Sequence, residues 1–250
     1  AGNSAGSSNT DGSITSTVSA NTTAGFSIVS YTGTGSDGAT VGHGLGATPD
    51  CIIIKNRDDS SQSFWAVYHQ GAFVSQSNPN ILYLNSTAAE SDDTNILGGS
   101  SVTINSTVFS LGDYNGVNGS NKDIIAYCFK GIPGYSKFGF YTGNGSSDGT
   151  FVYTGFKPAF VMIKRTDSTA NWRMIDSKRN AYNILPRTLT ASQNASEYTG
   201  TDDFGNTDIL SNGFKIRTSY AGCNASGGTY LWMAFGQTLV GSNNVPCTAR

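Results

Sequence analysis

The stretch Tyr31-Thr32-Gly33-Thr34-Gly35-Ser36-Asp37-Gly38 decides the organisation of this 250-residue chain, because a near-copy of it returns as Tyr141-Thr142-Gly143-Asn144-Gly145-Ser146-Ser147-Asp148-Gly149. The sequence after each copy also repeats, so that residues 124–129 are answered by residues 230–235 at almost the same offset. A period this long exceeds that of solenoid and propeller repeats and matches the size of a small domain. The chain is therefore predicted to be a tandem duplication.

Apolar runs and glycine turns recur between the copies, whereas the polar side chains around them do not. His43 and His69 face non-histidine residues in the second copy, and Cys51 faces Phe160. An active site depends on a few fixed polar groups, but a packing scaffold needs only volume and pattern. The duplication is typical of a scaffold.

Composition favours an all-β fold. Charged residues make up 13% of the chain, against roughly 25% in an average soluble domain. The abundant Gly, Ser, Thr and Asn favour short strands joined by tight turns. The expected strands cover residues 26–31, 39–43, 51–56, 64–69, 81–85, 108–111 and 124–129 in the first copy, and residues 138–141, 150–153, 160–165, 172–176, 187–190, 214–218 and 229–235 in the second.

Each copy is predicted to form one β-sandwich of the jelly-roll type. The expected division is a flexible polar N-terminal arm or linker at residues 1–24, sandwiches at residues 25–135 and 136–240, and a C-terminal tail at residues 241–250. The first segment is rich in small polar residues, which bury too little surface to fold. The runs Cys51-Ile52-Ile53-Ile54 and Phe160-Val161-Met162-Ile163 are apolar at every position, which predicts central strands with neither face open to water.

Charge and hydropathy argue against two classes of partner. The net charge is −2, and Lys and Arg are scattered along the chain, so nucleic acid is not an expected partner. A membrane is not expected either, because the sequence has no run of about 18 apolar residues. The segment from Gly33 to Gly38 matches G-x-G-x-x-G, but a dinucleotide-binding loop precedes a helix. Here a strand-like run follows, which favours a hairpin loop.

Catalytic patterns are sparse. The chain has only two histidines, without a nucleophile elbow or a zinc motif, so we predict no enzymatic activity and no cofactor of that kind. A glycan depolymerase would need two carboxylates across a groove. The available carboxylates, which nothing in the sequence pairs, are Asp50, Glu90, Asp123, Asp176 and Glu197.

Two acidic turns are the candidates for a metal site. One contains Asp113 and Asn115, and the other contains Asp202 and Asp203. Their oxygen atoms are ligands of the kind that calcium takes, although Asx-rich turns also cap their own backbone without an ion. Two interpretations therefore stay open, a calcium site and a pair of turns that bind no ion.

Four cysteines are too few for a disulfide scaffold in a chain of this length. Cys51 and Cys128 lie within apolar strands and are expected to be buried thiols. Cys223 in a glycine turn and Cys247 in the tail could form a disulfide that pins the C-terminus.

Aromatic residues are the remaining sign of a binding function. Trp65, Trp172 and Trp232 could offer ring faces to a sugar ligand. Trp65 and Trp172 also hold matching places in the repeat, as core residues do, so both interpretations stay open.

Several stretches carry a resemblance to a known group of proteins. They are Asp11-Gly12-Ser13-Ile14-Thr15-Ser16-Thr17-Val18-Ser19-Ala20, Val41-Gly42-His43-Gly44-Leu45-Gly46, Asp123-Ile124-Ile125-Ala126-Tyr127-Cys128-Phe129 and residues 155–165. They resemble an uncharacterised tandem β-domain of virion structural and tail-fibre-like proteins of tailed bacteriophages, many of them marine. The resemblance covers residues 11–240 and brings no catalytic residues with it. It implies an extracellular place on the virion surface or tail, with partners that are copies of the chain or other virion proteins.

The expected function is a non-enzymatic virion structural or adhesive module of the tail-fibre or decoration type. Such a module would act as a homo-oligomer by self-assembly, or by binding host-surface carbohydrate for attachment. One alternative is a glycan depolymerase with paired carboxylates. The other is a secreted cell-surface or filament-forming structural protein of a cellular organism.

Overall fold

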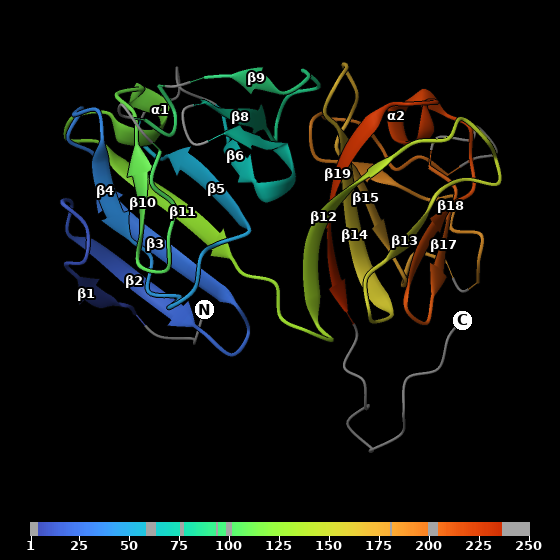
Figure 1. Cartoon of the computed structure of the whole chain (residues 1–250), viewed down its shortest axis with the longest axis horizontal. Helices are drawn as coiled ribbons and strands as arrows, with labels where there is room; N and C mark the ends of the chain where they lie inside the picture. The colour runs from blue at the N-terminus through green and yellow to red at the C-terminus, as the bar shows by residue number, and fades with distance from the viewer. Residues whose placement is uncertain are drawn as a thin grey trace. The chain divides into compact units, whose positions relative to one another are not determined.

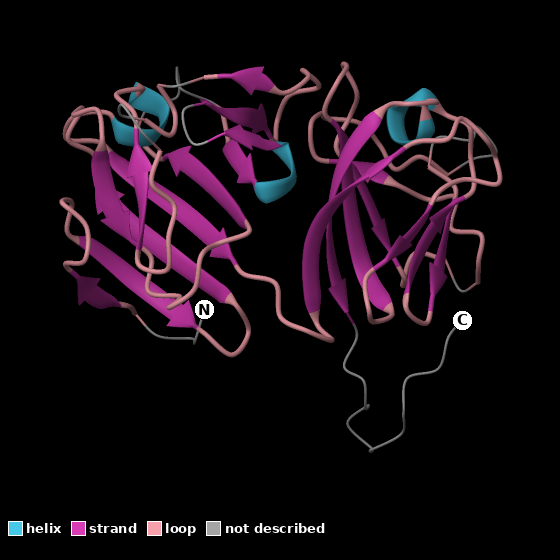
Figure 2. Cartoon of the chain, in the orientation of Figure 1, coloured by secondary structure: helices cyan, strands magenta, loops and turns pink. Residues whose placement is uncertain are grey.

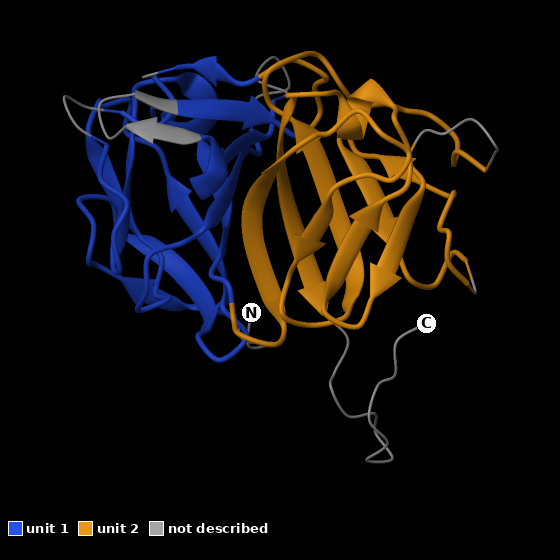
Figure 3. Cartoon of the chain, turned by 45° about the vertical axis from the view of Figure 1, so that its right-hand side comes forward, with its two compact units in different colours: residues 1–84, 90–131 blue, residues 85–89, 132–250 orange. Residues whose placement is uncertain are grey.

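The computed structural model describes residues 5–58, 64–75, 78–93, 95–98, 102–180, 182–199 and 205–236. It is 44% strand and 5% helix, so the predicted all-β fold is confirmed (Figure 2). The chain divides into two compact units. Unit 1 comprises Ala1–Leu84 with Glu90–Gly131, and unit 2 comprises Ile132–Arg250 with Asn85–Ala89 (Figure 3).

Unit 1 is a sandwich of a large and a small antiparallel sheet (Figure 1). The large sheet has the order β1-β2-β3-β11-β5-β6-β8-β7 with β9 beside β8, and the small sheet pairs β10 with β4. One core holds side chains from both sheets, such as Tyr31 and Phe109. The elements are β1 (Ser7–Asn9), β2 (Ser16–Asn21), β3 (Phe26–Thr32), β4 (Ala39–Gly42), β5 (Cys51–Asn56), β6 (Ala66–His69), a 3₁₀ turn (Gln70–Ala72), β7 (Phe73–Ser75), β8 (Asn78–Tyr83), β9 (Ser91–Asp92), β10 (Val108–Leu111), α1 (Asn115–Asn118) and β11 (Asp123–Phe129).

Unit 2 repeats this architecture. Its large sheet has the order β12-β19-β14-β15-β16, which corresponds to β3-β11-β5-β6-β8, and its small sheet has the order β13-β18-β17. A separate core joins the two sheets, with Tyr141 and Phe214 among its members. The elements are β12 (Ser136–Thr142), β13 (Phe151–Tyr153), β14 (Pro158–Arg165), β15 (Arg173–Asp176), β16 (Leu189–Thr190), β17 (Thr207–Leu210), β18 (Gly213–Ile216), α2 (Ala221–Asn224) and β19 (Thr229–Gly236).

The two apolar runs form central strands, as predicted. β5 lies between β11 and β6, and β14 lies between β19 and β15. Ile52, Ile54, Val161 and Ile163 are buried. Ile53 and Phe160 are only partly buried, so the prediction that neither face of these runs meets water is wrong at both residues. The Ile53 side chain alternates to the outer face of the sheet.

The repeated Tyr-Thr-Gly motif acts as a structural clamp in both units. The Tyr31 hydroxyl donates to the Val117 carbonyl at 2.7 Å, and the Tyr141 hydroxyl donates to the Cys223 carbonyl at 2.6 Å. A Cβ atom on Gly33 would lie only 2.4 Å from the Gly119 carbonyl oxygen, so only glycine fits there. The motif therefore fastens the end of β3 to α1 in unit 1 and the end of β12 to α2 in unit 2.

A buried asparagine in each short helix holds the loop that follows this motif. The Asn118 side chain accepts from the Thr34 N–H and donates to the carbonyls of Ser36 and Gly112. Asn224 holds the corresponding loop in unit 2. The loop leads into β4, which belongs to the small sheet, so the hairpin interpretation is wrong and the loop crosses from one sheet to the other.

The expectation of a flexible linker at residues 1–24 is wrong for residues 5–24, which the structure describes. β2 pairs along its whole length with β3, and β1 pairs with β2. Ile14 and Val18 are buried in the core of unit 1. The segment is too polar to fold alone, but a preformed sheet edge supplies hydrogen-bond partners for its backbone, and its few apolar side chains close the open side of the sandwich.

Candidate functional site

The three tryptophans predicted as ligand platforms differ in exposure. Trp172 is 0% and Trp232 is 3% exposed, so both are core residues and the ligand-binding prediction is wrong for them. Trp232 lies in β19 and packs edge-on against Phe214 at 5.6 Å between ring centroids. Trp65 is the partly exposed one, and it directly precedes β6.

Trp65 belongs to a row of aromatic rings on the outer face of the large sheet of unit 1. Its ring centroid lies 6.5 Å from that of Tyr127 with 16° between the planes, and Tyr127 lies 6.5 Å from Phe26 with 3° between the planes. Phe26 stacks in turn on Phe129 at 4.7 Å. Alternation places the partly exposed Tyr127 and Phe129 on one face of β11 while Cys128 points into the core. The result is a set of nearly parallel rings on a sheet surface.

A hollow of about 560 Å³, which we call the Trp65 hollow, lies at one end of this row. Its volume falls within the roughly 300–1,000 Å³ range of small-ligand sites. It has an aromatic wall and a rim of charged and amide groups. The lining residues are Lys55, Asn56, Arg57, Asp58, Trp65, Ile125 and Tyr127.

Hydrogen bonds hold the rim of the Trp65 hollow in place. The Asn56 amide nitrogen donates to the Asn115 carbonyl at 2.7 Å. The Asp123 N–H donates to the Asp58 carboxylate at 2.7 Å, and the Arg57 N–H donates to the Asp123 carbonyl at 2.8 Å. The rim backbone is therefore pinned at the end of β5, which favours a pre-formed site.

Arg57 also lines a second groove, of about 200 Å³, where its neighbours are mostly hydroxyl residues. They include Thr15 and Thr17 of the N-terminal segment together with Ser30 and Thr32 of β3. An arginine shared by an aromatic hollow and a hydroxyl-rich groove gives one surface with ring faces, hydrogen-bond donors and hydrogen-bond acceptors. This extended surface is the candidate site.

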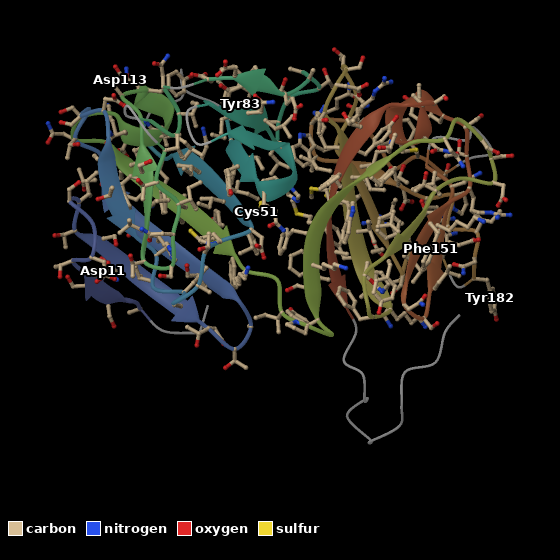
Figure 4. All side chains as sticks on the ribbon, viewed as in Figure 1. Asp11, Cys51, Tyr83, Asp113, Phe151 and Tyr182 are labelled. Carbon is tan, nitrogen blue, oxygen red and sulfur yellow. The ribbon has the colours of Figure 1, made fainter. Side chains whose placement is uncertain are left out.

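The predicted metal ligands are not gathered into a cluster. Asp113 is exposed in the loop that leads into α1 (Figure 4). Asn115, the first residue of α1, is also exposed, and its carbonyl accepts a hydrogen bond from the Asn56 amide. Asp202 and Asp203 lie outside the described residues. Within the described parts of the chain, no three His, Cys, Asp or Glu side chains stand close enough to hold a metal ion. Calcium stays an untested prediction.

The cysteines Cys51, Cys128 and Cys223 are buried. Burial raises the pKa of the Cys51 thiol well above its usual range, and it raises the pKa of Cys128 to about 12. Both thiols are therefore protonated and poor nucleophiles at neutral pH. Cys247 lies outside the described residues, so its pairing with Cys223 stays a prediction.

Three of the carboxylates considered for hydrolysis, Asp50, Asp176 and Glu197, have structural partners. Asp50 accepts from the Lys130 ammonium at 2.9 Å and from a backbone N–H. Asp176 and Glu197 are brought together in unit 2, but Arg179 lies between them, with 2.6 Å and 2.7 Å contacts to the two carboxylates. The three side chains therefore form an ion-pair network rather than an acid and base pair across a groove.

Comparison with known proteins gives a family. The profile described as Domain of unknown function (DUF7483) matches residues 1–238. The chain belongs to this family. The match spans both units, so the duplicated sandwich is itself the family's domain. No curated protein and no solved structure was found to match the chain. Among the helices that the structure describes, none is long and apolar enough to cross a membrane.

Most residues of this site could not be predicted from the sequence. Trp65 was predicted, but the rim residues Arg57 and Asp58 and the partner ring of Tyr127 were not. The sequence contains one indication of this surface. Residues 125, 127 and 129 are large and largely apolar, although residues 124, 126 and 128 already fill the core. That pattern shows that both faces of β11 are apolar, and a face that no second sheet covers is a candidate surface for a ligand.

Proposed function

We propose that the chain is a non-enzymatic structural and adhesive module of a virion that binds host-surface carbohydrate through the Trp65 hollow. The observation that carries this proposal is the arrangement around Trp65, in which stacked rings adjoin a pinned rim of charged and amide groups. The virion setting rests on the resemblance of the repeated motifs to tail-fibre-like proteins.

Carbohydrate fits the chemistry of this surface. The C–H face of a pyranose is apolar and packs on an aromatic ring, while its hydroxyl groups need donors and acceptors at the ring edge. Trp65 and Tyr127 supply the ring faces, Arg57 supplies donors, and Asp58 supplies acceptors. A sheet surface with pinned rim loops loses little conformational freedom on binding.

Retention on immobilised glycans tests the proposal. The probes are purified lipopolysaccharide, capsular polysaccharide and teichoic acid from candidate host bacteria, together with intact cells. We expect the parent chain to be retained on at least one of them, and Trp65→Ala to weaken that binding by about 5-fold or more, since stacking on an aromatic side chain contributes about 1–3 kcal/mol.

Tyr182→Ala is the matched control, because Tyr182 is also an exposed aromatic residue but belongs to unit 2 and is not among the residues that line the Trp65 hollow. Its binding should equal that of the parent. The proposal fails if no glycan or cell retains the parent, or if Trp65→Ala binds as tightly as the parent. Release of reducing ends from the retained polysaccharide would instead support the depolymerase alternative.

A further inference from the structure

One loop of the first repeat belongs to unit 2. Residues 85–89 follow β8 in the chain, yet they form part of the second compact unit (Figure 3). Within that unit, the Thr87 carbonyl accepts hydrogen bonds from the Ala170 N–H at 2.9 Å and from the Lys164 ammonium at 3.3 Å. Lys164 is fully buried, and a buried ammonium needs acceptors close to it. The loop therefore completes the folded structure of unit 2.

The place that this loop takes in unit 2 corresponds to the Trp65 hollow of unit 1. Lys55 lies opposite Ile125 across β5 and β11, and Lys164 lies opposite Leu231 across β14 and β19. Four positions of the hollow are matched in this way by the repeat, with the unit 1 residue first: Lys55 and Lys164, Trp65 and Trp172, Ile125 and Leu231, and Tyr127 and Met233.

The matched positions differ in exposure. In unit 1 all four are partly exposed, and they line a hollow of about 560 Å³. In unit 2, Lys164, Trp172 and Leu231 are 0% exposed, and Met233 is 4% exposed. Among the described residues, those that line the Trp65 hollow all belong to unit 1. The same place is therefore covered in unit 2 and open in unit 1.

Unit 2 has its own counterpart of residues 85–89. In both units, the residue just before the loop donates its backbone N–H to the carbonyl of the repeated tryptophan. The distances are 2.9 Å for Leu84 and 3.1 Å for Ala191, so residues 192–196 hold the position of residues 85–89. The two stretches are Asn85-Ser86-Thr87-Ala88-Ala89-Glu90 and Ser192-Gln193-Asn194-Ala195-Ser196-Glu197. Both loops are small and polar.

The loop of unit 2 is pinned at its base and exposed at its tip. The Ser192 hydroxyl accepts from the Trp172 N–H at 3.2 Å and donates to the Asn171 side chain at 2.9 Å. Residues 193–196 are exposed, whereas Thr87 in the first loop is partly buried. A loop held at its base loses little conformational freedom on binding. One chain thus carries an open hollow on unit 1 and an exposed loop on unit 2.

We propose that residues 192–196 of one copy of this chain occupy the Trp65 hollow of a second copy. The contact repeats, between copies, the one that residues 85–89 make inside unit 2. The Asn194 carbonyl then accepts from the Lys55 ammonium of the second copy, as the Thr87 carbonyl accepts from Lys164. An ammonium has three hydrogen atoms, so this bond adds to the other contacts of Lys55.

The contact is heterologous, because it joins a loop of one unit to a hollow of the other. Each copy offers one loop and one hollow, so copies add head to tail and growth stops only where a ring closes. A contact through one five-residue loop is small, and small interfaces are weak, so we expect a dissociation constant on the order of 10–100 μM. The proposal does not rest on carbohydrate binding, and the hollow holds either a loop or a glycan at one time.

Sedimentation velocity of the full chain over roughly 1–500 μM tests the proposal. The parent should form species larger than a dimer as its concentration rises. Ala195→Arg should stay monomeric, because the rim of the hollow carries two cations, Lys55 and Arg57, against the single carboxylate of Asp58. Ser211→Arg adds the same charge at an exposed turn residue of unit 2 outside the loop, and it should assemble like the parent.

A mixing experiment tests the loop and the hollow separately. Lys55→Glu removes the donor from the hollow and keeps the loop, whereas Ala195→Arg keeps the hollow. Each variant alone should be monomeric, but an equimolar mixture should form a dimer and nothing larger, since it contains only one intact kind of loop and one intact kind of hollow. A mixture that stays monomeric although both variants have the circular dichroism of the parent would overturn the proposal.

Fluorescence reports on the hollow in the parent chain, without any substitution. Trp172 and Trp232 are buried, so acrylamide quenches mainly Trp65. Quenching should become less efficient as the parent concentration rises, and it should not change for Ala195→Arg. At low concentration, Ala195→Arg should bind glycans like the parent, so the failure of either proposal is seen separately. A parent that is monomeric throughout, assembly that Ala195→Arg leaves intact, or a Trp65 ring shielded even at the lowest concentration, where the loop of the same chain would fill the hollow, contradicts the inference.

Discussion

Asn118→Ala should destabilise unit 1 strongly, because Asn118 is a fully buried polar residue. Its buried side chain forms three hydrogen bonds of 2.9 Å, accepting from the Thr34 N–H and donating to the carbonyls of Ser36 and Gly112. Alanine leaves these groups without their partner. A buried polar group without a partner costs about 1–3 kcal/mol. We therefore expect the free energy of unfolding of unit 1 to fall by about 4 kcal/mol.

This loss is large compared with the roughly 5–15 kcal/mol total stability of a typical domain. For a urea dependence of about 2 kcal/mol per M, the unfolding midpoint of unit 1 should fall by about 2 M. Hydrogen exchange with mass spectrometry along a urea series measures this midpoint separately for peptides of each unit. Peptides of unit 2 should keep the parent midpoint.

Two further variants make the result specific. Asn224→Ala removes the corresponding side chain of unit 2, so it should lower the midpoint of unit 2 and leave unit 1 unchanged. Asn194→Ala changes an exposed asparagine and should alter neither midpoint. If Asn118→Ala moves the midpoint of unit 1 by less than about 0.5 M, the duplicated loop clamp contributes little, and the reasoning is refuted.

Three other predictions concern unit 1. Ile54→Asp should abolish folding of the unit, because an unpaired charge would enter the core. Ile53→Asp should lower the free energy of unfolding by clearly less, since Ile53 lies on the outer face of the sheet. Equal losses of the circular dichroism signal in the two variants would contradict the strand orientation. Cys51 and Cys128 should not react with a thiol reagent in the folded chain at pH 7, because burial raises the pKa of both thiols. Both should react at once when the chain is unfolded in urea. Rapid labelling of the folded chain would count against their burial. Burial lowers the pKa of His43, whose Nδ1 accepts a backbone N–H while its Nε2 lies 3.1 Å from a carbonyl oxygen. The unfolded state then binds more protons than the folded state as the pH falls below about 6.5, so the melting temperature of unit 1 should decrease from pH 7 to pH 5. His43→Gln should flatten that decrease, and an unchanged pH profile would argue against the assignment.

Much of the fold follows from local sequence patterns. The apolar runs at residues 51–54 and 160–163, bounded by turn residues, are typical of strands in any setting, and the duplication required the second copy to fold like the first. The N-terminal segment is different, because its strands form only where the edge of β3 offers backbone partners. No property of residues 5–24 taken alone distinguishes a docked strand from a linker.

The sequence by itself determined an all-β chain of two homologous halves, since alternation, turn chemistry and repetition act over short distances. Only the tertiary structure decided which aromatic residues face water. Trp65 and Trp172 hold the same place in the repeat, yet one lines a hollow and the other is fully buried. Exposure is set by neighbours from elsewhere in the chain, and a linear pattern does not encode them.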